Sequence, residues 1–349
     1  MSEPNRSRGG ANRPSQTPQQ QGKATPAQPP GKGPAQPVGP VPNLFRRIDW
    51  ITAAVTTILV LAGYLFTLAP QVTLEDSGEL AVGSFYAGVP HPPGYPVWTI
   101  YTWLFTVLFP FSNVAWRVAL SSAVAAAASC GILALIVSRG SSMMIESIND
   151  LKNLDKRTEN ALCMLAGWVA GTMLGFNGYM WSQAVIVEVY TFSVLSLALV
   201  LVTLLRWIYA PHQRRYLYWC AFWFGICFTN HQTLIVAAMG IEVAILAASI
   251  GLGRDLFAFN ALVSAAGLVV MSKGGLTNLS ENKAILIVYH LVGLASLAVA
   301  VVAWWKTLKL FTELKSALIM GAMWILGALF YFYMPIARSE EHTSELQSR

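Results

Sequence analysis

The chain has 349 residues, of which 55% are hydrophobic and 11% charged, and its mean hydropathy is +0.51. This balance excludes an ordinary soluble domain and predicts a polytopic membrane protein of the all-α class. The net charge of +6 does not indicate a nucleic-acid partner, because the basic residues fall in the amino-terminal tail and in short loops, where they orient a membrane protein. The four cysteines lie within apolar runs without metal-ligand spacing, so neither a disulfide framework nor a zinc site is expected.

The chain opens with a polar segment, residues 1–43, rich in Pro, Gln and Gly. Such a composition predicts a disordered cytoplasmic tail. A second interpretation is a polybasic contact with anionic membrane lipids through Arg46 and Arg47, next to the first span. An apolar run at residues 48–68 follows, and about 20 residues suffice to cross a hydrocarbon core of about 30 Å. This run is the first predicted span, and it delivers the next segment to the outer face.

The next segment, residues 73–96, places Glu75, Asp76, Glu79 and His91 between apolar runs. Ionisable groups beside a membrane indicate a functional site. Two interpretations of Asp76-Ser-Gly-Glu79 stay open: a capping box at a helix start, or carboxylates that include a general base. The His-Pro-Pro-Gly-Tyr-Pro sequence predicts a rigid turn, whether or not the His91 side chain faces the carboxylates as a ligand.

The apolar run at residues 97–109 is bracketed by Pro96 and Pro110. Its length as a helix would be about 20 Å, too short for a comfortable span, which predicts an interfacial or re-entrant helix. If this run does not span, nearly every later loop Lys and Arg falls on the cytoplasmic side, whereas a spanning helix would destroy that bias. The prediction is therefore about nine spans plus one short helix, with the other spans at residues 114–137, 161–174, 187–205, 217–229, 233–252, 256–271, 284–305 and 317–334.

This topology gathers later polar clusters on the same outer face as the carboxylates. Glu188 lies in an apolar run, where a charge is costly, so we expect it to belong to the site together with Gln183 and Tyr190. Asn230 and His231 join two predicted spans with almost no loop. They either satisfy helix ends in a tight turn or reach the same cavity, and both interpretations stay open.

Five motifs, in chain order, resemble the domain-of-unknown-function 2723 family, polytopic proteins of the GT-C glycosyltransferase type that are similar to protein O-mannosyltransferases. The motifs are Glu-Asp-Ser-Gly-Glu, Gly-Val-Pro-His-Pro-Pro-Gly-Tyr-Pro, Trp-Ser-Gln-Ala-Val-Ile-Val-Glu-Val-Tyr-Thr, Thr-Asn-His-Gln-Thr and Tyr-Phe-Tyr-Met-Pro-Ile-Ala. The resemblance covers residues 50–337.

The resemblance implies a GT-C transmembrane helix bundle that transfers a hexose such as mannose from a polyprenyl-phosphate donor to an extracytoplasmic protein or cell-envelope glycan. It implies Asp76 as the base or acceptor-orienting group, with Glu79 in the same catalytic motif. The residues implied in substrate binding are Glu75, His91, Tyr95, Gln183, Glu188, Tyr190, Asn230 and His231. No metal ligands are assigned, but a divalent metal is one way to neutralise the donor phosphate, because no arginine is placed to do so.

Two further expectations complete the interpretation. The protein is expected in a bacterial inner membrane with a cytoplasmic amino terminus, and residues 44–337 are expected to form an incomplete GT-C-like domain, because residues 338–349 resemble a translated sequencing adapter. The alternative function is a transporter or flippase-like protein with an ion path through Asp76, Glu188 and His231. The lack of an internal repeat and the position of the polar clusters at one face disfavour it.

Overall fold

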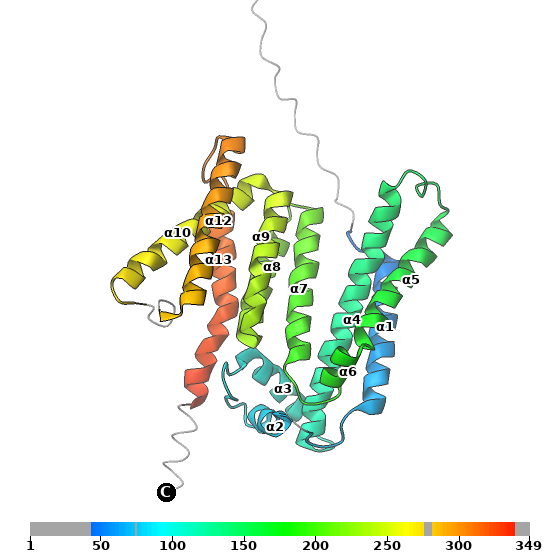
Figure 1. Cartoon of the computed structure of the whole chain (residues 1–349). Helices are drawn as coiled ribbons and strands as arrows, with labels where there is room; N and C mark the ends of the chain where they lie inside the picture. Colours follow the sequence, from blue (N-terminus) through cyan, green and yellow to red (C-terminus); the bar gives the residue numbers. More distant parts are fainter. Residues whose placement is uncertain (1–42, 74, 276–280, 339–349) are drawn as a thin grey trace, which may run out of the picture. The chain divides into compact units, whose positions relative to one another are not determined.

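The computed structural model describes residues 43–73, 75–275 and 281–338, so most of the predicted tail (1–43) and of the predicted foreign segment (338–349) lies outside the described residues. In these ranges the chain forms helices and no strand, which confirms the all-α class (Figure 1). The helices are α1 (Arg47–Thr67), α2 (Ser77–Phe85), α3 (Pro96–Leu108), α4 (Val114–Ser147), α5 (Lys156–Gly175), α6 (Gly178–Ala184), α7 (Tyr190–Tyr209), α8 (Arg214–Asn230), η1 (Gln232–Val236), α9 (Ala237–Ala248), α10 (Ile250–Ser272), α12 (Lys283–Thr307), α13 (Leu314–Ala328) and η2 (Leu329–Phe332).

Each of the nine predicted spans corresponds to a helical segment, but residues 187–189 of the span 187–205 precede α7, and Ser249 interrupts the span 233–252. The segments also differ in length. Six are long and apolar enough to cross a membrane, namely α1, α4, α7, α10, α12 and α13 with its extension to residue 338. The pair α5 and α6, bent by 65°, is a seventh candidate. Two segments are shorter, at 17 residues each. One is α8, which begins with two arginines, and the other is the continuous segment of η1 and α9. The chain is thus a polytopic, integral membrane helix bundle, and the count of nine spans stays a prediction.

The short helix expected between two prolines is present as α3, with 13 residues. Pro96 occupies its first turn, where the missing N–H costs nothing and the fixed φ favours a helix. Pro110 follows the last helical turn and cannot continue it. The helix packs against α2, α4 and α8, and with α2 it lies at one end of the bundle, opposite the α4–α5 connection (Figure 1).

Helix α5 packs tightly on α1 and α4 through glycines spaced every four residues, Gly167, Gly171 and Gly175. A Cβ atom built on Gly171 would lie 2.6 Å from Cγ2 of Thr56 and 2.7 Å from the carbonyl oxygen of Cys130. Small residues at this spacing allow helix backbones to approach closely within a membrane. The three helices therefore form a close-packed unit, and α4 also contacts α3, α6 and α7.

Candidate active site

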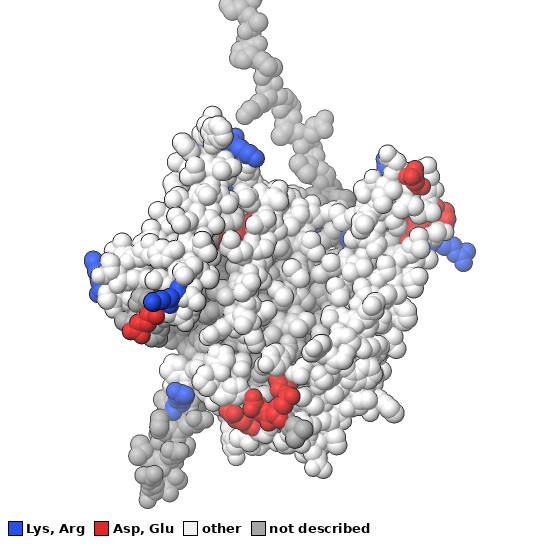
Figure 2. All heavy atoms as spheres, in the orientation of Figure 1, with Lys and Arg blue, Asp and Glu red and all other residues white. Residues whose placement is uncertain are grey.

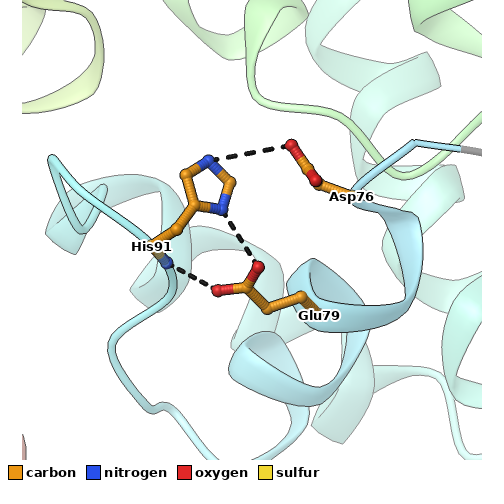
Figure 3. A group of neighbouring side chains, drawn as sticks. All are labelled: Asp76, Glu79 and His91. Carbon is orange, nitrogen blue, oxygen red and sulfur yellow. Dashed lines mark hydrogen bonds and ion pairs between the residues drawn. The ribbon is translucent and has the colours of Figure 1, made fainter.

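The centre of the site is the pair formed by Glu79 on α2 and His91 in the loop before α3 (Figure 3). Glu79 Oε1 accepts a hydrogen bond from the His91 backbone N–H at 2.7 Å, and Oε2 lies 3.2 Å from His91 Nδ1. On the other side of the ring, His91 Nε2 lies 3.8 Å from Asp76 Oδ2. The imidazole thus stands between two carboxylates.

This geometry tests the capping-box interpretation of Asp76-Ser-Gly-Glu79, and the general-base interpretation stays a prediction. Asp76 does precede α2 as its N-cap residue, but its side chain makes no capping hydrogen bond. The Glu79 carboxylate reaches across to His91 instead of back to the helix start. The capping-box interpretation is therefore wrong, and both carboxylates face His91.

The turn that carries His91 has an unusual backbone. Gly94 has φ +91°, and Tyr95 has φ +41°, in the left-handed region that side chains other than glycine avoid. Such a conformation costs on the order of 1–3 kcal/mol and persists only where the surroundings determine it. Here it brings the Tyr95 hydroxyl to 3.3 Å from His91 Nε2. The expected rigid turn is present, and it places Tyr95 in the site.

Glu188 enters the site from the link between α6 and α7 and is buried. Its carbonyl oxygen accepts hydrogen bonds from Trp98 Nε1 at 3.2 Å and Ser122 Oγ at 3.1 Å, which fasten this link to α3 and α4. Its carboxylate accepts a hydrogen bond from the Val189 backbone N–H at 3.0 Å. No motif signalled Trp98 or Ser122, because contacts between residues this far apart leave no local pattern.

The ionisable groups of the site shift one another's pKa values. Burial raises the pKa of Glu188, although the hydrogen bond from the Val189 N–H acts to lower it. The neighbouring carboxylates Glu75 and Asp76 raise this pKa further. Burial also raises the pKa of Tyr95, and the negative field of its acidic neighbours adds to the shift. The four carboxylates therefore belong to one constellation.

The other predicted site residues surround this centre at different distances. The Tyr190 ring lies 5.6 Å from the His231 ring, and His231 Nδ1 lies 2.5 Å from Thr233 Oγ1. Asn230 is buried between helices, where its Nδ2 donates to Ser196 Oγ at 3.4 Å. Tyr190 acts on the pKa of Tyr95 and so lies near the centre, with His231 beside Tyr190. The described contact of Asn230 is with a neighbouring helix.

Gln183 faces a separate pocket of about 420 Å³ that also includes Tyr190 and Thr191. Its Oε1 atom is buried and has no hydrogen-bond partner among the described residues. The carboxylates of the centre do not line this pocket. Gln183 is therefore a neighbour of the site through Tyr190.

The end of the described chain closes another side of the site. The Tyr333 hydroxyl donates to the Ala87 carbonyl, and the side chain of Met334 lies against Gly94. A pocket of about 830 Å³ opens between α2, residues 87–90 and residues 333–337, and Glu79 forms part of its wall. Its size suits a small molecule or a sugar.

The surface over this centre is strongly acidic (Figure 2). The patch lies at the end of the bundle that holds α2, and no Lys or Arg side chain is visible within it. In the described part of the chain, every carboxylate that forms an ion pair with Lys or Arg is remote in sequence from Glu75, Asp76, Glu79 and Glu188. The site therefore favours cations and hydrogen-bond donors over anions.

Fold and site together define a polytopic membrane protein with a carboxylate–histidine centre at one end of its helix bundle. A family model described as the Protein O-mannosyl-transferase TMEM260 N-terminal domain matches residues 76–251, half of the chain, and the chain belongs to this family. The match begins at Asp76. The O-mannosyltransferase-like resemblance is thereby confirmed, whereas the name domain-of-unknown-function 2723 stays a prediction.

Two curated relatives carry the same name. Protein O-mannosyl-transferase TMEM260 of Mus musculus is 27% identical over 180 residues, which cover 51% of this chain and 23% of the relative. The protein of the same name from Dictyostelium discoideum is 39% identical over 61 residues, 17% of this chain and 7% of the relative. The matched part of the chain thus spans less than a quarter of either relative. No solved structure matches the chain.

Proposed function

We propose that the protein is a membrane glycosyltransferase of the O-mannosyltransferase type. The observation that carries this proposal is the position of the family match, which begins at Asp76 and takes in Asp76, Glu79, His91 and Glu188. The relatives are named as O-mannosyl-transferases, and a hydroxyl acceptor suits an acidic site rich in hydrogen-bond acceptors.

In the proposed reaction the sugar comes from a polyprenyl-phosphate hexose, mannose being our choice. The acceptor hydroxyl oxygen attacks C1 of the sugar, and the bond between C1 and the phosphate oxygen breaks. Polyprenyl phosphate leaves with the bonding electron pair, and the hydroxyl proton passes to Asp76. A single displacement of this kind inverts the configuration at C1.

Asp76 is the best candidate for the base because its carboxylate is 61% exposed and stands at the mouth of the site. Glu188 is buried and so is less accessible to an acceptor than Asp76. His91 and Tyr95 lie beside Asp76 and border the space that the acceptor would enter. We interpret Glu79 as a positioning residue that acts through His91.

We place the site on the extracytoplasmic side of a bacterial inner membrane, with a protein or cell-envelope glycan as acceptor. The transporter alternative requires ionisable groups midway along the helices, whereas Asp76, Glu188 and His231 lie at helix ends or in links. The pocket beside Glu79 offers room for a sugar.

The test measures sugar transfer from polyprenyl-phosphate mannose in membranes that carry the native protein or Asp76→Asn. Loss of a general base should slow transfer about 100- to 10,000-fold. Asp150→Asn, an exposed carboxylate in the α4–α5 connection, is the matched control and should retain the native rate. Transfer by Asp76→Asn at the native rate would remove Asp76 from the mechanism.

A further inference from the structure

We infer that His91 and Asp76 bind a divalent cation, of the Mg²⁺ or Mn²⁺ class, that receives the phosphate of the sugar donor. The inference rests on the proposed function for the identity of the phosphate. The cation site itself is argued from the side chains of the centre. Asp76, Glu79 and His91 offer ligand atoms that all lie within 4.8 Å of one another.

The protonation of His91 leaves a lone pair on Nε2, which the Tyr95 hydroxyl reaches at 3.3 Å and which a cation would take over from that hydroxyl. A carboxylate only accepts hydrogen bonds, so the contact between Glu79 Oε2 and His91 Nδ1 places the ring proton on Nδ1. Nε2 then carries the lone pair, on the side of the ring that faces Asp76 (Figure 3). A histidine held by a carboxylate through its other nitrogen is the usual arrangement around a protein-bound metal, because it fixes the tautomer and raises the basicity of the ligand.

The separation of the two ligand atoms fits an ion between them. His91 Nε2 and Asp76 Oδ2 lie 3.8 Å apart, too far for a hydrogen bond. Two neighbouring ligands of an ion bound at about 2.1 Å lie about 3.0–3.4 Å apart, so a movement of a few tenths of an ångström suffices. Both side chains are partly exposed, at 34% and 61%, and can make that movement.

The charge of the centre is an independent reason for a cation. Asp76 and Glu79 lie beside the His91 imidazole, and Glu75 and Asp76 lie near Glu188. In the described chain no Lys or Arg forms an ion pair with any of these four residues. Like charges at such short range repel one another, and an anionic donor would meet the same repulsion. A divalent ion would reduce the repulsion among the carboxylates and the repulsion of the donor. Ions of this class bind through one or two protein carboxylates, water and substrate phosphate.

The cation can be measured directly by titrating the purified full chain in detergent with Mn²⁺ and following the free ion by electron paramagnetic resonance. We expect one bound Mn²⁺, which is lost in His91→Ala and in Asp76→Asn. Glu79→Gln should weaken binding about 10- to 100-fold, because it disturbs a group that orients a ligand. Asp150→Asn and His212→Ala, exposed residues in connections between other helices, are matched controls and should bind as the native protein does.

The result that overturns the inference is an absence of Mn²⁺ binding, or binding that His91→Ala and Asp76→Asn leave unchanged. Asp76→Asn keeps the test valid if His91→Ala does not fold, because the exposed Asp76 side chain makes no capping bond. Sugar transfer measured with and without EDTA separates this inference from the proposed function. Transfer that persists in EDTA refutes the cation alone, whereas bound Mn²⁺ without any sugar transfer refutes the proposed transferase alone.

Discussion

The sharpest test of how the site works is the substitution Glu79→Gln. Glu79 makes two contacts with His91, one to the backbone N–H and one to Nδ1. An amide side chain can keep the first contact through its carbonyl oxygen, but it presents an N–H₂ group to Nδ1. Nδ1 must then accept, so the ring proton moves to Nε2 and the lone pair that faces Asp76 disappears.

The expected size of this effect follows from one hydrogen bond. A hydrogen bond of this kind contributes about 1 kcal/mol net, and 1.4 kcal/mol corresponds to a tenfold change, so we expect about a five- to tenfold loss of kcat/KM for sugar transfer. Because the Glu79 side chain is about half exposed (51%), the free energy of unfolding should change by less than about 1 kcal/mol. Glu146→Gln, a carboxylate of similar exposure (54%) at the far end of α4, is the matched control.

The assay is a comparison of kcat/KM for Glu79→Gln, His91→Ala and the double variant. If Glu79 acts only through His91, the double variant should be no slower than His91→Ala. A Glu79 that reacts with substrate directly would give losses that add, and a loss as large as that of Asp76→Asn. Either outcome, or a fully active Glu79→Gln, would refute the positioning role.

Three further predictions concern stability and topology. Gly171→Ala should cost about 1–3 kcal/mol of stability, because its Cβ would press on α1 and α4. Gly140→Ala is the control and should be neutral or stabilising, because a Cβ there meets nothing within 4 Å. Equal unfolding temperatures of the two variants in detergent would contradict this packing. Because burial raises the pKa of Glu188 in the folded state, stability should fall as pH rises from the ordinary glutamate pKa to that raised pKa. Glu188→Gln should flatten this fall in unfolding temperature, and parallel pH profiles of the two proteins would count against the raised pKa. Cysteines introduced at the exposed positions Ser182 and Asp150 should be labelled from opposite sides of the membrane. The four native cysteines are buried and should give little background. Labelling of both positions from the same side would refute the proposed topology.

The sequence predicted the helices better than it predicted the directions of polar side chains. Long apolar runs and flanking prolines were enough to locate the predicted spans and α3, because burial in a membrane and the lack of a proline N–H act locally. The role of Glu79 was ambiguous, since a residue three positions after an N-cap has the same spacing whether it caps the helix or reaches elsewhere.

Contacts over long range could not be predicted. Trp98 and Ser122 fasten the Glu188 link, yet neither belongs to a pattern that marks a partner far along the chain. Asn230 and Gln183 were grouped with the site because polar residues at a helix end suggest a cavity. The helix rotation, which no single sequence fixes, instead turns Asn230 toward Ser196 and Gln183 toward a separate pocket.

Helix α3 shows how a short element can build a site at the membrane surface. Its buried side chains include threonines, Thr99, Thr102 and Thr106, whereas its exposed side chains are apolar, Trp103, Leu104, Val107 and Leu108. A water-facing helix has the opposite pattern, so this arrangement is that expected of a helix set into hydrocarbon.

Both ends of α3 are tied down at the same end of the bundle. Tyr95, at its start, meets His91, while the Thr106 carbonyl near its end accepts a hydrogen bond from Arg117 Nη1 at 3.0 Å. Arg117 also donates hydrogen bonds to the carbonyls of Phe111 and Ser112, so this guanidinium at the start of α4 stabilises the α3–α4 turn. The Arg117 guanidinium is therefore not available to neutralise charge at the acidic centre. The anionic sugar donor of the proposed reaction requires a positive charge from another source.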